Sequence, residues 1–464
     1  TEPDLPTPIT ESVDIVGNGN LVNGNLFYID QSGGVNNPTV CPDFNSGAKF
    51  ANYGGALLQV GDRDDPDGND SVEVTVTNFR TTRLTRFAYV HANAKLTVDN
   101  VEIKRTSGVT SAGQCNLATI TADPGAEVTL TNTTITETAI PLSGRNPIVG
   151  LEFLAAVIVG QDAVLNIDNV KITDTFGDVA GAVLWSRKNQ AANVRIVNSE
   201  FQRSGGFFIG GSIVRFVNST YQLTDLDPAL FRDNIIPFNG TTFISRASTF
   251  NFGSGRCDNC RNPLDLSSTT GKTLGFHVPT LAGLPDPLVN FQESALGRQT
   301  AAVPELQMLG GDPSVFSSDT ETWLQPSAAQ TASEIASFLP DAITAVPGLP
   351  ETPSNFQTAR TPIVPGVLVE AVGAVGNDLR SPIPPFDLIT EDINGQPRLY
   401  ANGTRNIGAV QNVDAPPLSA SAGNAEVTLT WSPTPDGQQN GYEICSTITV
   451  LTDPLTGSCP DAVI

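Results

Sequence analysis

The sequence predicts an all-β protein whose main part is a right-handed parallel β-helix. Three observations support this prediction: a short strand–asparagine–strand pattern recurs, apolar residues keep fixed positions around each asparagine, and the spacing between copies varies. The recurring segments are VTVTNFRT, LTVDNVEI, VTLTNTTI, LNIDNVKI, VRIVNSEF and VRFVNSTY. Because a solenoid grows by adding rungs, the 464 residues do not have to divide into compact domains.

Each copy carries one central asparagine, and apolar side chains stand two and four residues before it, which is the alternation of a strand with one buried face. Three residues after it, five of the six copies are again apolar or aromatic, so the phase shifts and the chain must turn at the asparagine. Asparagine tolerates the left-handed conformation of such a corner, and its amide can bond to an identical amide one rung away. The predicted structural ladder consists of Asn78, Asn100, Asn132, Asn169, Asn198 and Asn218.

The spacings between these asparagines are 22, 32, 37, 29 and 20 residues. This variation excludes a strict short-period solenoid and indicates loops of different length at the other corners. An antiparallel sandwich is the structural alternative, although repeated identical units favour parallel stacking. Residues 243–252, FISRASTFNF, are predicted to be a seventh, degenerate copy with Ala247 at the asparagine position.

Composition and sequence pattern divide the chain into four regions. Residues 1–50 are rich in Gly, Asn and Pro and predict an N-terminal cap and first rung, and residues 51–260 predict the regular rungs. Residues 261–412 predict irregular later rungs, Pro-rich loops and a closing motif. Within them a helix is expected over 326–339, because proline suits a first helical turn and a second proline follows the last residue. Residues 413–464 differ in texture from the rest.

Residues 391–411, EDINGQPRLYANGTRNIGAVQ, resemble the closing signature of bacterial surface β-helix proteins of the choice-of-anchor and polymorphic outer-membrane type. That signature reads D-x-x-G-x-P-R, a spacer, and D-I-G-A-x-E. Asn406 and Gln411 replace the family's acids, so an ion-pair or ion-binding role of those acids is not implied here. The resemblance covers roughly residues 40–412 and implies an exported, surface-associated β-helix. The matching residues are Gly395, Pro397, Arg398, Ile407, Gly408 and Ala409.

The segment LSASAGNAEVTLTWSPTPDGQQNGYEICS looks like the opening of a fibronectin type III domain. Trp431 would be its buried strand-B tryptophan and Tyr442 its strand-C tyrosine. Residues 413–464 supply about half of the roughly 100 residues of such a sandwich, so the resemblance implies a partial module. Either the parent polypeptide continues beyond Ile464, or the segment docks onto a neighbour, which would make the chain a self-assembling subunit.

Charge limits the partners. The 48 acidic residues against 25 basic give a net charge of −23, which repels nucleic acid and anionic lipid. The same charge suits divalent cations, a salty medium or simple solubility. We expect no nucleic-acid partner and no membrane span, because the most apolar stretch, residues 148–160, is too short, contains Glu152 and predicts a buried strand.

The chain opens with Thr1 rather than Met, so we expect a removed export signal and a secreted, extracellular or cell-surface location. An oxidising compartment would pair its even number of cysteines. The CxxC favours a local disulfide over half a zinc site, since no second CxxC and no nearby His completes a metal set. The last two cysteines form a second pair near the C-terminus, and the first two remain by elimination. The disulfide candidates are Cys41, Cys115, Cys257, Cys260, Cys445 and Cys459.

Residues 61–71, GDRDDPDGNDS, crowd hard oxygen ligands around a glycine turn, as calcium loops do. The loop departs from the EF-hand pattern, because Arg63 stands where an Asp is expected and no Glu closes it. Calcium is the one cofactor expected, and a solvated acidic loop is the alternative. The candidate ligands are Asp62, Asp64, Asp65, Asp67, Asn69 and Asp70.

Right-handed β-helices include pectate lyases and polygalacturonases, but their catalytic sets are not assembled here. His91 and His277 lack flanking glycines, and Lys95 and Lys171 lack clustered acids on their strands. We therefore predict no catalytic residues and favour a non-enzymatic exported structural or adhesive protein. If the open C-terminal module docks onto a neighbouring copy, the chain would self-assemble into filaments. The partners considered are copies of itself, glycans or cell-surface components. The alternative is a polysaccharide-active lyase or glycoside hydrolase with a groove along the β-helix.

Overall fold

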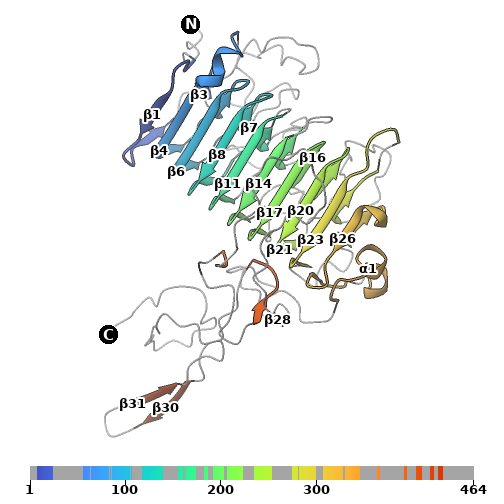
Figure 1. Ribbon diagram of the computed structural model, residues 1–464. Helices are drawn as coiled ribbons and strands as arrows, with labels where there is room; N and C mark the ends of the chain where they lie inside the picture. The colour runs from blue at the N-terminus through green and yellow to red at the C-terminus, as the bar shows by residue number, and fades with distance from the viewer. Residues whose placement is uncertain are drawn as a thin grey trace, which may run out of the picture.

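The strands of this protein stack as rungs of one long solenoid, shown in Figure 1 as a computed structural model. Successive rungs pair in parallel, so the fold is an all-β parallel solenoid and not an antiparallel sandwich. The structure describes residues 8–23, 56–62, 64–82, 84, 86–104, 106, 118–138, 155–159, 162–173, 182–186, 192–202, 206–222, 235–252, 274–280, 282–298, 307–327, 330–344, 363–365, 391–393, 395, 404–409, 418–422 and 427–431.

One face is a nine-stranded sheet in which each strand pairs with the next rung in chain order. Its strands are β3 (Ala56–Val60), β5 (Arg86–Val90), β7 (Ala118–Ala122), β10 (Ala155–Val159), β13 (Ala182–Ser186), β16 (Phe207–Gly210), β19 (Ile235–Phe238), β22 (Leu274–Val278) and β25 (Gln307–Gly311).

A larger sheet bends at the asparagine corner and therefore has two columns of strands. The column before the corner is β1 (Val13–Val16), β4 (Glu73–Thr82), β6 (Lys95–Lys104), β8 (Glu127–Thr131), β11 (Val164–Asp168), β14 (Asn193–Val197), β17 (Ile213–Val217), β20 (Thr242–Arg246), β23 (Leu288–Gln292) and β26 (Phe316–Ser318). Strands β4 and β6 run through the corner. The column after it also holds β2 (Leu21–Asn23), β9 (Thr134–Thr136), β12 (Lys171–Thr173), β15 (Glu200–Gln202), β18 (Thr220–Gln222), β21 (Thr249–Phe252), β24 (Ala295–Arg298) and β27 (Trp323–Leu324).

The register explains the alternation in the sequence. The residue four before each asparagine pairs with its counterpart on the next rung, as Val74 does with Leu96 and Leu96 with Val128. These side chains point into the solenoid and are at most 1% exposed. The seventh copy is confirmed, because Ala247 separates β20 from β21 with φ 45°. An eighth copy turns at Glu293 with φ 49°, and the sequence reading missed it because glutamate replaces asparagine.

A second corner, between the nine-stranded sheet and the column before the asparagine corner, is tight on several rungs. Asn93 and Gly125 adopt positive φ of 65° and 79°, and the amides of Ala94 and Ala126 close the turns. Loops of different length were expected at both other corners, and the second corner also varies, from two residues between β16 and β17 to twelve between β3 and β4. The longest connections lie at the third corner, between the column after the asparagines and the next rung, as between β6 and β7.

The interior changes from aliphatic to aromatic along the stack. Early rungs bury Val, Leu and Ile, whereas later rungs bury rings that touch one another. The centroid of the Phe250 ring lies 5.2 Å from that of Phe276 and 5.0 Å from that of Phe216. These edge-to-face and tilted contacts are favourable geometries for aromatic side chains.

One short helix, α1 (Ala332–Phe338), covers the last rung, where the Phe338 ring lies 5.5 Å from Phe316. The helix expected from residue 326 starts later because Thr331 and Glu334 form a capping box. Two 3-10 turns are η1 (Gly68–Ser71) and η2 (Pro313–Val315). Within the part of the chain that the structure describes, no helix has the length and apolar character needed to cross a membrane.

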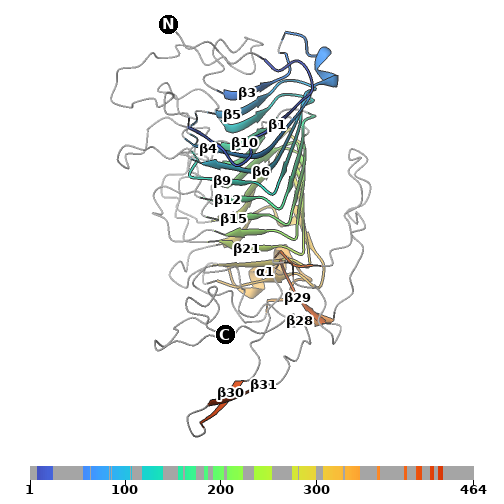
Figure 2. The ribbon, with the colours of Figure 1, turned by 90° about the vertical axis from the view of Figure 1, so that its left-hand side faces the viewer.

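Two further antiparallel pairs lie outside the solenoid (Figure 2). Strand β28 (Ile363–Pro365) pairs with β29 (Thr404–Asn406), and β30 (Leu418–Ala422) pairs with β31 (Val427–Trp431). The second pair falls in the region that resembles a fibronectin type III opening, and it is a two-stranded hairpin. Tyr442 lies outside the described residues.

Candidate functional site

The asparagine corner runs along the outside of the solenoid as a column of side-chain amides. All six predicted asparagines adopt φ between 45° and 54°, the left-handed region that asparagine tolerates. Three amide-to-amide hydrogen bonds join neighbouring rungs. They run from Asn100 to Asn78 at 2.5 Å, from Asn169 to Asn132 at 2.7 Å, and from Asn218 to Asn198 at 2.7 Å.

Aspartates complete the column between these pairs, which the sequence reading did not foresee. The amide of Asn132 donates to Asp99 at 2.8 Å, and that of Asn198 donates to Asp168 at 3.1 Å. Both aspartates directly precede a corner asparagine, so their carboxylates can reach the amide on the next rung. The column is therefore polar and partly anionic rather than uniformly neutral.

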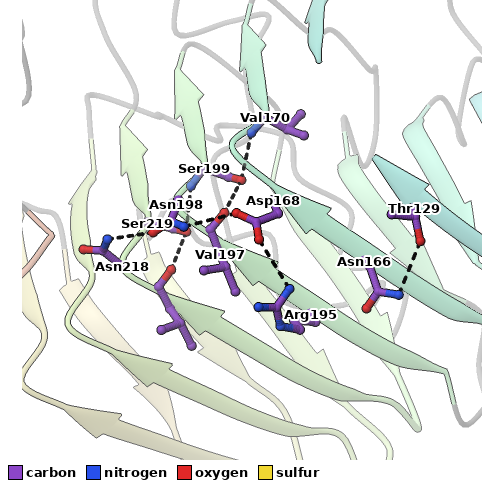
Figure 3. A network of polar contacts seen from close by, with 11 residues as sticks. Thr129, Asn166, Asp168, Val170, Arg195, Val197, Asn198, Ser199, Asn218 and Ser219 are labelled. Carbon is purple, nitrogen blue, oxygen red and sulfur yellow. Dashed lines mark hydrogen bonds and ion pairs between the residues drawn. The ribbon is translucent and has the colours of Figure 1, made fainter. Parts of the chain in front are cut away.

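A second ladder of hydroxyl groups lies directly inside the corner (Figure 3). Ser199 and Ser219 follow their asparagines, and each hydroxyl donates to the carbonyl two residues earlier, at 2.6 and 2.7 Å. The backbone amide of Ser199 in turn donates to the Ser219 hydroxyl at 3.0 Å. These buried hydroxyls satisfy backbone groups that the bend would leave unpaired. The Asn-Ser and Asn-Thr dipeptides of the repeat were the available sequence signal.

An open groove follows the asparagine corner at the N-terminal rungs. It has a volume of about 590 Å³ and lies between the corner residues and the outward residues two positions later. The exposed ion pair between Arg80 and Glu102, 2.8 Å apart, stands on its far side. We call it the corner groove; its lining is Asn18, Gly19, Asn78, Phe79, Arg80, Asn100, Val101, Glu102, Asn132 and Thr134.

The closing segment, which the structure describes at residues 391–393, 395 and 404–409, contacts the same corner at the C-terminal rungs. The Asn218 amide donates to the Glu391 carbonyl at 3.1 Å, and the Gly408 amide donates to the Glu293 carbonyl at 2.9 Å. The Ala409 amide donates to the Thr249 hydroxyl at 2.9 Å. Corner residues 218 and 293 and the outward residue 249 are counterparts of those that line the corner groove.

The exposure of the corner residues decreases where the closing segment contacts the corner. Asn78, Asn100, Asn132 and Asn169 are exposed, whereas Asn218 is 2% exposed. Ala247, on the rung between Asn218 and Glu293, is fully buried. The corners on both sides of Ala247 contact the closing segment, and a fully buried position of this kind suits a small residue.

Gly408 is fitted to this contact. Its φ of 95° disfavours any other residue, and a Cβ at this position would lie 2.5 Å from the Thr249 hydroxyl. Ile407 packs beside it against Ala295 and Trp323. The closing motif thus contributes both apolar burial and hydrogen bonds to the later rungs.

Outward charges on the larger sheet are paired between rungs. Lys95 lies 2.9 Å from Glu73, and Lys171 lies 3.1 Å from Glu200. The hydrogen bond and the charge of Glu73 raise the pKa of the Lys95 ammonium, so this lysine stays protonated. A lyase base on this strand would need the opposite shift.

In the acidic loop, residues 61–71, side-chain oxygen atoms accept hydrogen bonds from the backbone amides of the same loop. The Asn69 side chain is 1% exposed, donates to the carbonyls of Asp62 and Ala92 at 2.7 and 2.9 Å, and accepts from the Asp62 amide at 2.6 Å. Asp65 accepts from the Gly68 amide at 3.1 Å. Across the described ranges, no three His, Cys, Asp or Glu side chains converge as a metal site. Calcium binding here stays a prediction, which calorimetric titration of the full chain would test.

A buried polar cluster, which the sequence reading missed, lies on the outer face of the nine-stranded sheet. The Tyr89 hydroxyl donates to Asp123 at 2.7 Å, and the His91 Nδ1 lies 3.5 Å from the other oxygen of that carboxylate. Arg86 stands 5.2 Å from the centre of the Tyr89 ring. His91 is only 1% exposed. The signal was the tyrosine–histidine alternation at the end of β5, one rung before Asp123.

No family model, no curated protein and no solved structure matches this chain.

The groove, the closing segment and the buried cluster are therefore interpreted from their own chemistry. All six cysteines, and hence the predicted disulfides, lie outside the described residues. His277 is half-buried on β22, on a later rung than His91, so the two histidines do not form one site.

Proposed function

We propose that this protein is an exported, non-catalytic surface or extracellular protein that adheres through the corner groove. The groove is the observation that carries the proposal, because it offers amides, a partly buried ring and an ion pair on a rigid stack of rungs. Clefts that combine apolar surface with a few fixed polar groups are typical binding sites. Rigid strands hold those groups in place without a cost of ordering them on binding.

We also propose that the chain is related to choice-of-anchor and polymorphic outer-membrane proteins and that its solenoid is right-handed. This family relation is supported by the contacts that Ile407, Gly408 and Ala409 of the closing motif make with the later rungs. A partial fibronectin type III module after the solenoid, secretion, disulfides and filament formation through the C-terminal module are the other elements proposed. Electron microscopy of the purified chain distinguishes filaments from dispersed particles.

Binding of the full chain to an array of immobilised polysaccharides and extracellular-matrix proteins tests adhesion. Thr134→Trp fills the groove from its rim, and Asn166→Ala removes an amide from the same face outside the groove. Binding that is lost with the first variant and kept with the second is expected. Binding that is equal in both variants, or absent in the unaltered chain, would contradict the proposal.

A polysaccharide-active enzyme is the second candidate, favoured by the Tyr89–Asp123–His91 cluster. A carboxylate between a phenol and an imidazole has the group types of acid–base catalysis. The burial of His91 places this candidate behind adhesion. Screening of acidic polysaccharides with and without calcium tests it, and turnover that Asp123→Asn abolishes would replace the first proposal.

A further inference from the structure

Building on the proposed function, we infer that the corner groove binds an extended polypeptide segment of a partner protein. The inference rests on one relationship within the molecule. The corner that is open over the first rungs is already filled by polypeptide over the later rungs, and the filling shows which chemistry the corner accepts.

The contacts of the closing segment are made largely by its backbone. The Glu391 carbonyl accepts from a corner amide, and the amides of Gly408 and Ala409 donate to the corner and to the outward column. Backbone groups occur in every polypeptide, so this mode of binding requires an extended chain. It also requires a small residue where that chain comes closest to the corner, as at Gly408.

The corner groove repeats the amide donors of that site. An amide NH2 carries two hydrogens. At Asn218 one goes to Asn198 along the ladder and the second to the Glu391 carbonyl. Asn100 and Asn132 also donate along the column, and both are exposed, so a second hydrogen is available for a ligand carbonyl.

The outward column differs between the two places, and the difference predicts specificity. The closing segment meets Thr249 and Ala295, which are small. The corner groove instead presents Arg80, Glu102 and Thr134. With a net charge of −23 on the chain, a neutral or basic segment with glycine or alanine at the crossing fits this groove best.

A synthetic peptide of residues 391–411 is the probe, because residues 391, 408 and 409 of this segment contact the corner and the outward column. It carries a photoreactive group and is added to the intact full-length chain. Cross-links within residues 78–134 are expected. Cross-links confined to residues 218–298 would show exchange with the protein's own closing segment and would overturn the inference, as would the absence of cross-links.

Variants locate the peptide in the groove. Thr134→Trp should weaken peptide binding more than tenfold, and Asn100→Gly, which keeps the positive φ of this corner, should weaken it about fivefold, the effect of one hydrogen bond. Asn166→Ala, outside the groove, should leave it unchanged. Arg80→Trp fills the groove from an exposed position and replaces Thr134→Trp if that variant does not fold.

Measuring the binding of oligosaccharides in the same assay distinguishes failure of this inference from failure of the proposed function. Groove-dependent binding of a glycan without binding of the peptide would overturn the polypeptide ligand and leave adhesion standing. Loss of both kinds of binding would remove both. A concentration-dependent rise in mass of the chain alone, abolished by Thr134→Trp, would identify the occupant as a second copy and overturn the partner-protein assignment.

Discussion

The side-chain amide of Asn169 donates a 2.7 Å hydrogen bond to the side-chain oxygen of Asn132, 37 residues earlier in the chain. The two residues share one backbone conformation, with φ of 54° and 48°. Each such residue therefore has two separable roles: it permits the bend, and it ties one rung to the next.

Substitution of Asn169 separates these roles. Asn169→Gly keeps the left-handed conformation and loses the amide, so it should lower the free energy of unfolding by about 1 kcal/mol. Asn169→Ala should lower it by a further 1–2 kcal/mol or so, because alanine resists positive φ. Urea denaturation of both variants measures the difference, with Asn166→Ala as the control. Equal losses for glycine and alanine would show that the backbone conformation contributes nothing.

Restoring the ladder at Ala247 should do harm. Ala247→Asn introduces the side chain that six other corners carry, yet Ala247 is fully buried, so a larger side chain would have to displace its surroundings. We expect a loss of about 1–3 kcal/mol in unfolding free energy from overpacking. Hydrogen exchange at the Ala409 amide should rise in the same variant. A stabilised Ala247→Asn protein with unchanged exchange would contradict the burial described for this rung.

The aromatic part of the interior should be the costliest to truncate. Phe276 is fully buried and its ring contacts Phe243, Phe250, Phe252 and Phe291. Phe276→Ala should therefore cost about 3–5 kcal/mol. Leu288→Ala, at a position that is 49% exposed, is the matched control and should cost under about 0.5 kcal/mol. Thermal unfolding followed by circular dichroism compares them.

The cap of α1 should weaken in acid. The Thr331 backbone amide and then its hydroxyl hydrogen-bond to Glu334 and hold the pKa of that carboxyl below its usual value of 4.5. A lowered folded-state pKa contributes stability that is present above the unfolded value and is lost as the pH falls through the folded value. The stability difference between the unaltered chain and Glu334→Gln should thus be seen at pH 7 and shrink below about pH 4.5. A difference independent of pH would exclude the carboxylate as its source.

The rungs could be predicted from the sequence because their signals are local. Alternation before each asparagine and the phase shift after it are set within eight residues, as in VTVTNFRT, and burial of Val74 and Val76 follows directly. The corner at Glu293 was not predicted, because glutamate rarely adopts positive φ and its residue type therefore does not indicate a corner.

The site was harder to predict because its contacts join distant parts of the chain. Nothing near Thr249 in the sequence indicates that its hydroxyl accepts a hydrogen bond from the amide of Ala409, 160 residues later. The cluster of Tyr89, His91 and Asp123 has the same origin, since neighbouring rungs bring its members together on the outer face of a sheet. The alternation of tyrosine and histidine at the end of β5 is a local signal, but nothing in the sequence points from it to Asp123 on the next rung.

The position of the longest connections at one corner has a consequence for how such a chain can change. Insertions between β6 and β7, or between β12 and β13, lengthen the polypeptide at a single edge and leave the register of every rung intact. Evolution can therefore vary that edge freely while the rest of the scaffold is inherited unchanged. The same edge is the place to graft a foreign epitope.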